Sequence, residues 1–239
     1  MPSETMQAIV LRNANYRDFD RMVTLFSPTM GRVDALARGC RRPKSPLLPA
    51  SELFTHGEFV LFRKGEQFTL SACEITDAFY PLRLDNDRLS CGAYLLELTG
   101  AAVQPDQPAV ELYAALLQGL YRLSYTDASP LSVVCSFLLL FASLCGYKPR
   151  LNHCALCRKA LDTTQGAYLS PQAGGLLCAE CSPTGEARMT REQILWMRRT
   201  LAEGMTDEQQ KTDASAAFPF LRRYVESRLD REIKSSRFL

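Results

Sequence analysis

The first third of the chain alternates apolar and polar residues over short segments. Such alternation is typical of β-strands, whose successive side chains point to opposite faces of a sheet. Residues 6–13 form one such segment, and residues 22–38 form two more around a turn that contains Pro28 and Gly31. Because Pro fixes one φ angle and Gly accepts a positive one, residues 22–38 are predicted to form a hairpin.

A second hairpin is predicted at residues 56–75, where two apolar runs flank the turn dipeptide Gly65-Glu66. Strands this short, closed by tight turns, indicate a small antiparallel barrel of about five strands. The OB-fold is the commonest barrel of this size with a binding face. Phe62 and Phe68 are expected in its core. The Pro- and Ser-rich stretch at residues 41–51 interrupts the strands, and we expect a basic loop there.

The hydrophobic period changes to three and four residues after Asp87, which indicates helices. One segment without charges follows Ser129-Pro130, an N-cap with Pro at the first helical position. It is at the short edge of what spans a membrane, contains three serines and has no second apolar segment to accompany it, so a helix buried on all sides is predicted. Thr190 begins a capping box. The helices are expected at residues 87–103, 110–121, 131–144, 194–201 and 221–233.

Four of the nine cysteines form two Cys-x-x-Cys pairs separated by twenty residues. Two thiolates at this spacing span one edge of a tetrahedron, and two pairs complete it, with Zn–S distances of about 2.3 Å. The ligands are Cys154, Cys157, Cys178 and Cys181, and one structural Zn²⁺ per chain is predicted. Four thiolates leave no open position for water, which argues against catalytic zinc. The other five cysteines are expected to be buried thiols.

Charge is distributed unevenly along a chain whose net charge is only +2. Residues 1–50 carry eight Arg or Lys against four Asp or Glu, and the last 23 residues carry six against three. Two basic ends on a neutral body can bind a polyanion locally. Guanidinium groups pair bidentately with phosphate oxygens. The candidate phosphate-binding residues are Arg38, Arg41, Arg42 and Lys44, supported by Arg12, Arg17 and Arg32; Tyr16 is the best candidate to stack on a base.

The sequence offers no evident catalytic machinery. It contains two histidines, no P-loop and no Gly-x-Gly-x-x-Gly motif, and its carboxylates are dispersed. We therefore expect a protein that is not an enzyme and takes no small-molecule substrate. The residues after Met1 form no signal-peptide core, so a cytoplasmic protein without membrane attachment is expected.

Three segments have counterparts, in the same order, in one known family. They are residues 30–45 (MGRVDALARGCRRPKS), the two Cys-x-x-Cys pairs and the closing residues 221–239. Together they resemble the bacterial RecO family of recombination mediators over nearly the whole chain. The first segment is similar to the family's KGxRRxxS motif, with Arg38 where lysine is frequent. The turn at residues 17–20 departs from the family, which more often has a glutamate there.

The resemblance implies a protein that binds single- and double-stranded DNA and anneals complementary strands. It further implies action with RecR, and often RecF, to load RecA onto DNA covered by the single-strand-binding protein SSB. Family members also bind the acidic C-terminal tail of SSB. No residue of that tail site carries over, but Arg222 or Arg223 could serve at a basic rim. A nucleoid-associated location in the bacterial cytoplasm is implied.

The expected architecture is an α+β multidomain protein. It comprises an OB-fold DNA-binding barrel at residues 1–82, a helical domain that begins at 83–150, a zinc-ribbon-like insertion at 151–187, and closing helices at 188–239. Two other functions stay open. A zinc-ribbon module for RNA or transcription would prefer RNA and anneal no DNA, and a zinc-stabilised hydrolase would show turnover.

Overall fold

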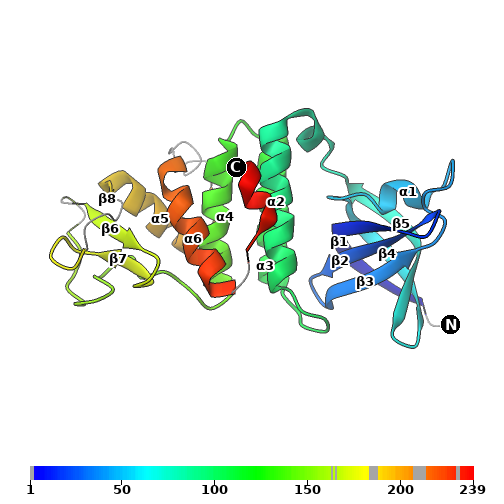
Figure 1. Ribbon diagram of the computed structural model, residues 1–239, viewed down its shortest axis with the longest axis horizontal. Helices are drawn as coiled ribbons and strands as arrows, with labels where there is room; N and C mark the ends of the chain where they lie inside the picture. The colour runs from blue at the N-terminus through cyan, green and yellow to red at the C-terminus, as the bar shows by residue number, and fades with distance from the viewer. Residues whose placement is uncertain (1–2, 163, 165, 183–187, 207–213, 230–231) are drawn as a thin grey trace. The chain divides into compact units, whose positions relative to one another are not determined.

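The computed structural model describes residues 3–162, 164, 166–182, 188–206, 214–229 and 232–239. The chain packs as two compact units, Met1–Leu120 and Tyr121–Leu239. Figure 1 shows a β-barrel, drawn in blue and cyan, in the first unit and a small sheet with helices in the second. The predicted boundary between barrel and helical domain at residue 82 remains a prediction, since the first compact unit extends through helical residues to Leu120.

Five strands form the barrel of the first unit. They are β1 (Ser3–Tyr16), β2 (Asp20–Ser27), β3 (Gly31–Ala37), β4 (His56–Lys64) and β5 (Gln67–Asp77). The closed order is β1-β2-β3-β5-β4; β3 and β5 are parallel, and the other pairs, including β1 with β4, are antiparallel. The two predicted hairpins are β2–β3 and β4–β5. This five-stranded arrangement confirms the predicted OB-type barrel.

Alternate residues of each strand point into the barrel. In β3, Val33, Ala35 and Ala37 are buried, whereas Asp34 is exposed and Leu36 half-buried, as the alternation predicts. The prediction for Phe62 was wrong, because its side chain is 39% exposed. Phe59 and Leu61 point inward, so the next residue must point outward; four consecutive apolar residues hid this period. Phe68 packs against the core.

Two helices follow the barrel; the first unit includes all of the first helix and the second helix as far as Leu120. These are α2 (Asn86–Ala102) and α3 (Val110–Tyr125), preceded by the 3₁₀ turn η1 (Tyr80–Leu84). Phe26 of β2 meets Tyr113 of α3 edge to face, with ring centroids 5.3 Å apart. The β2–β3 turn lies against the α2–α3 connection, where the Arg32 N–H donates to the Gln104 carbonyl (3.1 Å) and the Asp106 N–H to the Met30 carbonyl (2.9 Å).

Three longer helices dominate the second unit. α4 (Pro130–Leu144) packs against α5 (Arg191–Glu203) and α6 (Phe218–Leu229), and Figure 1 shows these helices side by side. Ten residues of α4 are buried, which confirms the predicted central helix. The 3₁₀ turns η4 (Ser215–Ala217) and η5 (Lys234–Phe238) lie before and after α6. Within the described part of the chain, no helix is long and apolar enough to cross a membrane.

The observed helix ends agree with some of the capping and boundary predictions and differ from others. Thr190 and Gln193 form the predicted capping box of α5 with both hydrogen bonds (3.2 and 3.0 Å). Pro130 begins α4 as predicted, but the Ser129 side chain makes no capping hydrogen bond. α6 starts three residues before the predicted Leu221 and ends at Leu229; residues 230–231 of the expected helix lie outside the described residues.

Candidate functional site

The basic loop at residues 38–46 joins β3 to the short helix α1 (Leu47–Ala50). Its first half lies against the β1–β2 turn. The Gly39 N–H donates to an Asp20 carboxylate oxygen (2.7 Å), and the Arg41 N–H donates to the Phe19 carbonyl (2.9 Å). The Arg41 guanidinium also donates to the Asp18 carbonyl (3.2 Å). The loop expected at residues 41–51 is therefore partly correct: it ends in a helical turn, and the β1–β2 turn holds it.

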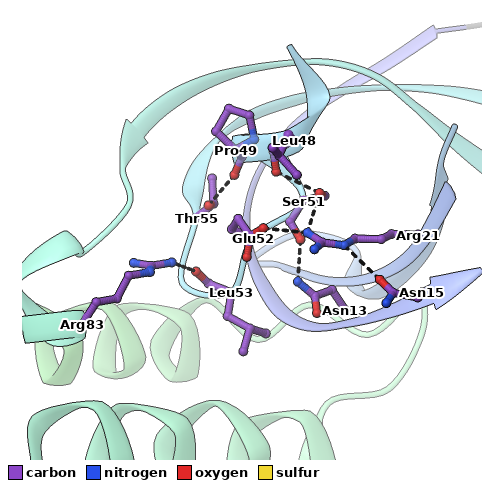
Figure 2. Close-up of polar contacts among 10 residues, drawn as sticks. All are labelled: Asn13, Asn15, Arg21, Leu48, Pro49, Ser51, Glu52, Leu53, Thr55 and Arg83. Carbon is purple, nitrogen blue, oxygen red and sulfur yellow. Dashed lines mark hydrogen bonds and ion pairs between the residues drawn. The ribbon is translucent and has the colours of Figure 1, made fainter. Parts of the chain in front are cut away.

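The other end of the loop is fixed through α1, as Figure 2 shows. The Asn13 amide donates to the Ser51 carbonyl (2.7 Å), and Arg21 forms an ion pair with Glu52 (2.7 Å). Arg83 donates to the Leu53 carbonyl (2.8 Å). These contacts tie the segment after α1 to β1, to β2 and to η1. No local sequence pattern predicts these contacts, because each joins residues about thirty or more positions apart.

Five of the seven predicted phosphate-binding residues gather on this loop and turn. They are all exposed: Arg17, Arg38, Arg41, Arg42 and Lys44. Their side chains stand on two segments that hydrogen-bond to each other, so their positive charges share one end of the barrel. Among the described residues, the Arg38 guanidinium has no acidic partner, which leaves it available for an anion.

The two remaining candidates stand on the outer face of the barrel strands. Arg12 of β1 is opposite Thr24 of β2, which is opposite Asp34 of β3. Arg32 donates two hydrogen bonds to one Asp34 oxygen (2.7 and 3.1 Å), and the Thr24 hydroxyl donates to the other (2.6 Å). The charge of Arg32 is thus balanced within the protein, whereas Arg12 has no acidic partner among the described residues.

Two exposed aromatic rings accompany the basic residues. Tyr16 is 42% exposed and Phe19 is 48% exposed. The Arg17 guanidinium lies over the Tyr16 ring at 5.1 Å from its centroid, and the Arg42 guanidinium lies over the Phe19 ring at 5.6 Å. Phe54, a third aromatic residue near the loop in sequence, is buried and offers no accessible face.

The four predicted ligand cysteines converge in the second unit. Their sulfur atoms all lie within 4.8 Å of one another, and the Cys157 and Cys178 sulfurs are 3.7 Å apart. A tetrahedron with Zn–S distances of about 2.3 Å has edges of about 3.8 Å, so the donor set fits a tetrahedral metal ion. His153 is exposed beside the cluster. The four cysteines therefore form a site that can hold a metal.

A three-stranded sheet carries the second cysteine pair. β6 (Ala167–Ser170) and β7 (Gly175–Leu177) form a hairpin, which ends just before Cys178, and β8 (Arg188–Met189) adds a strand beside β6. The first pair is held against this hairpin, because the Ala155 N–H donates to the Leu176 carbonyl (2.8 Å). Among the described residues, the buried cluster next to the cysteine pairs has three members: Cys154, Ala155 and Leu177.

The thiols of the cluster share negative charge unevenly. Burial by itself would raise the pKa of Cys154, but backbone N–H groups of Cys178, Cys157 and Leu156 lower that pKa to about 6. Hydrogen bonding with the Cys178 and Cys157 sulfurs raises the pKa of Cys181 to about 12. One thiolate thus forms readily and disfavours another nearby. A divalent cation would remove this repulsion and stabilise all four thiolates.

The two candidate partner-binding residues differ in their surroundings on α6. Arg222 is half-buried; its guanidinium donates to the Ser236 carbonyl (3.5 Å) and lies over the Phe218 ring at 5.9 Å. Arg223 is exposed. Arg222 therefore holds the closing segment against α6, and Arg223 is the more accessible cation.

The fold and the site define a class of protein: an OB-type barrel with a basic, aromatic-lined end, followed by a helical region with a four-cysteine cluster. Comparison with known families gives two matches. Residues 1–79 match the model described as "Recombination protein O N terminal", and residues 83–237 match "Recombination protein O C terminal". The chain therefore belongs to the RecO family of DNA repair and recombination proteins.

Curated relatives agree with this assignment. The chain is 36% identical to a protein named "DNA repair protein RecO" from Acetivibrio thermocellus over 72% of this chain and 68% of the relative. It is 31% identical to the protein of the same name from Symbiobacterium thermophilum, over 98% of this chain and 95% of the relative. The similarity thus spans both compact units.

Proposed function

We propose that this protein is a recombination mediator that binds single- and double-stranded DNA through the basic loop and the β1–β2 turn. The observation that carries the proposal is the gathering of five exposed cations on two segments that hydrogen-bond to each other. Family membership supports a role in DNA repair. The bound groups are phosphates, because guanidinium and ammonium groups match their charge and geometry.

Binding of this kind anneals complementary strands by physical means. Arg and Lys side chains neutralise phosphates and release counterions, so two strands of like charge can approach each other. Contacts to the backbone leave the pairing edges of the bases free. No bond is made or broken, and the protein acts without turnover.

Zn²⁺ is the metal that we propose for the four-cysteine cluster. Thiolate ligands and a tetrahedral arrangement favour zinc over magnesium or calcium, which prefer oxygen ligands. With four protein ligands the ion has a structural role. It would fold an element whose buried centre is too small to hold it together.

The same proposal extends to protein partners. The mediator would act with RecR, and functionally with RecF, to load RecA onto single-stranded DNA that SSB covers. A basic residue on α6 would meet the acidic tail of SSB, and the exposed Arg223 fits that role better than Arg222, which contacts the closing segment. A cytoplasmic, nucleoid-associated location follows from these partners.

The decisive test is the annealing of complementary DNA oligonucleotides coated with SSB, with and without the protein. Acceleration that fades as salt rises is the expected result. A protein that binds DNA without accelerating annealing would be an adaptor that depends on RecR, which contradicts intrinsic annealing. Preference for RNA over DNA of the same sequence, without annealing, would instead support the alternative of an RNA-binding zinc-ribbon module.

A further inference from the structure

The turn between β1 and β2 presents aromatic surface to solvent where the fold does not require it. Tyr16 is the last residue of β1 and pairs with Asp20, so Phe19 lies in the three-residue turn between them. Neither ring belongs to the barrel core, and both are more than two-fifths exposed. Exposure of two neighbouring aromatic rings beside a cluster of cations calls for a ligand with both a flat face and negative charge.

Hydrogen bonds and a guanidinium group hold Phe19 in place. Its carbonyl accepts from the Arg41 N–H (2.9 Å), while the Asp18 carbonyl before it accepts from the Arg41 guanidinium (3.2 Å). The Arg42 guanidinium lies 5.6 Å from the Phe19 ring centroid. The same arginines that offer positive charge to phosphates therefore also fix the turn that carries the ring.

We infer that Phe19, with Tyr16 beside it, is a stacking site for an unpaired nucleobase, which makes this end of the barrel selective for single-stranded over double-stranded DNA. This inference rests on the proposed function, because the loop must first hold the strand by its phosphates. In a duplex both faces of each base are covered by neighbouring pairs, so an aromatic ring meets only the backbone and the base edges and has no base face to stack on. In a single strand a base can turn toward the ring.

Stacking at this site is compatible with strand annealing. An aromatic ring covers the face of a base and leaves its Watson–Crick edge open to a complementary strand. Stacking also releases no counterion, so it adds affinity without changing the salt dependence that phosphate contacts create. The two contributions can therefore be separated in a plot of log affinity against log salt concentration. Phosphate contacts set the slope of this plot, and stacking shifts the whole line by a constant amount.

The test uses the full-length protein and the variant Phe19→Leu, which keeps an apolar side chain and removes the ring. The probes are a fluorescent thymidine 20-mer, an abasic 20-mer with the same phosphates, and a 20-base-pair duplex. Binding to the thymidine strand should weaken about tenfold, with the same salt slope, whereas binding to the duplex and the abasic strand should stay unchanged. Phe19→Trp should restore binding to the thymidine strand.

Phe62→Leu is the matched control, because Phe62 is an exposed aromatic residue of similar accessibility on the outer face of β4. It should bind all three probes as the original protein does. Equal loss of all three probes in Phe19→Leu, or no loss of any, would overturn the stacking site while leaving phosphate binding intact. Failure of the unaltered protein to bind any probe would overturn the proposed function itself.

Discussion

At the scale of single residues, the ion pair between Arg32 and Asp34 separates two kinds of arginine on the barrel. Arg38 has no acidic partner among the described residues, whereas Arg32 donates twice to Asp34. A phosphate must compete with Asp34 for Arg32 but finds Arg38 free. Position in the sequence does not distinguish the two residues, since both belong to the same basic segment.

We therefore expect Arg38→Ala to weaken DNA binding several-fold more than Arg32→Ala. Asp34→Asn should strengthen binding about two- to fivefold, because it removes the negative charge that is paired with Arg32 at a mostly exposed site. Fluorescence anisotropy at a fixed, low salt concentration measures all three. Equal losses for both arginine variants would show that Asp34 does not restrain Arg32.

Gly31 occupies a position that no other residue can fill without cost. Its φ angle is +66°, and an added Cβ would lie 2.2 Å from the Gln104 carbonyl oxygen. Gly31→Ala should lower the free energy of unfolding by about 3 kcal/mol, through the left-handed backbone and the clash together. Thermal and urea denaturation measure the loss.

Gly65→Ala is the matched control for that substitution. Gly65 also has a positive φ angle, +61°, but nothing lies within 4 Å of its added Cβ. Its cost should be only that of the left-handed backbone, about 1 kcal/mol. If both variants lost the same stability, the close contact between the β2–β3 turn and the α2–α3 connection would contribute nothing to the cost of Gly31→Ala.

At the scale of elements, local periodicity predicted the strands and helices that face a single core. The buried alternation of β3 and the all-round burial of α4 follow directly from their sequences. β1 is longer than its predicted core of residues 6–13, since its polar end continues by pairing with β2 as far as Tyr16. That extension depends on the partner strand, which a local pattern does not contain.

The candidate sites show the same difference between what local sequence predicts and what depends on distant partners. The spacing of the four cysteines was enough to predict that they converge, because two short Cys-x-x-Cys turns and one hairpin determine their geometry. The charge of the basic loop was also evident. The hydrogen bonds that fix the loop join Asp20 to Gly39 and Asn13 to Ser51, and they arise only when the barrel closes. Chemical character could be predicted, whereas the contacts that position it could not.

The cysteine element should depend on its metal for its fold. Freshly reduced protein should contain about one zinc per chain, and less than half an equivalent would contradict the proposed site. Cys157→Ser, or removal of zinc with a chelator, should expose residues 151–182 to proteases, because the buried cluster beside the cysteines has three members among the described residues. Cys145→Ser, at a half-buried thiol outside the cluster, should leave zinc content and protease resistance unchanged.

At the scale of the whole molecule, the net charge of +2 means that the proposed DNA binding must depend on where the charges lie. A weak overall field gives little attraction at a distance, so most of the salt dependence should arise from the few cations that touch phosphates. A nearly neutral protein could thus still bind DNA at one end of its barrel, as we propose.

Replacing Arg38, Arg41 and Arg42 together by Ala should lower the log–log salt slope of duplex binding by up to about 2.7, which is three contacts at about 0.9 each. A control should change Arg63, Arg199 and Arg237, exposed arginines outside the loop, to Ala. Both triple variants shift the net charge from +2 to −1. Only the loop variant should lose slope; equal losses would place the binding surface elsewhere.

Because both ends of the basic loop are anchored, the loop should affect the rates at which a DNA strand associates and dissociates. A loop that is ordered before it meets its ligand loses little conformational entropy on binding. If DNA binds there, capture would need only a diffusional encounter, and release would need no segment of the protein to refold. A strand could then slide along the barrel end or pass to its complement at a rate set by phosphate contacts and salt.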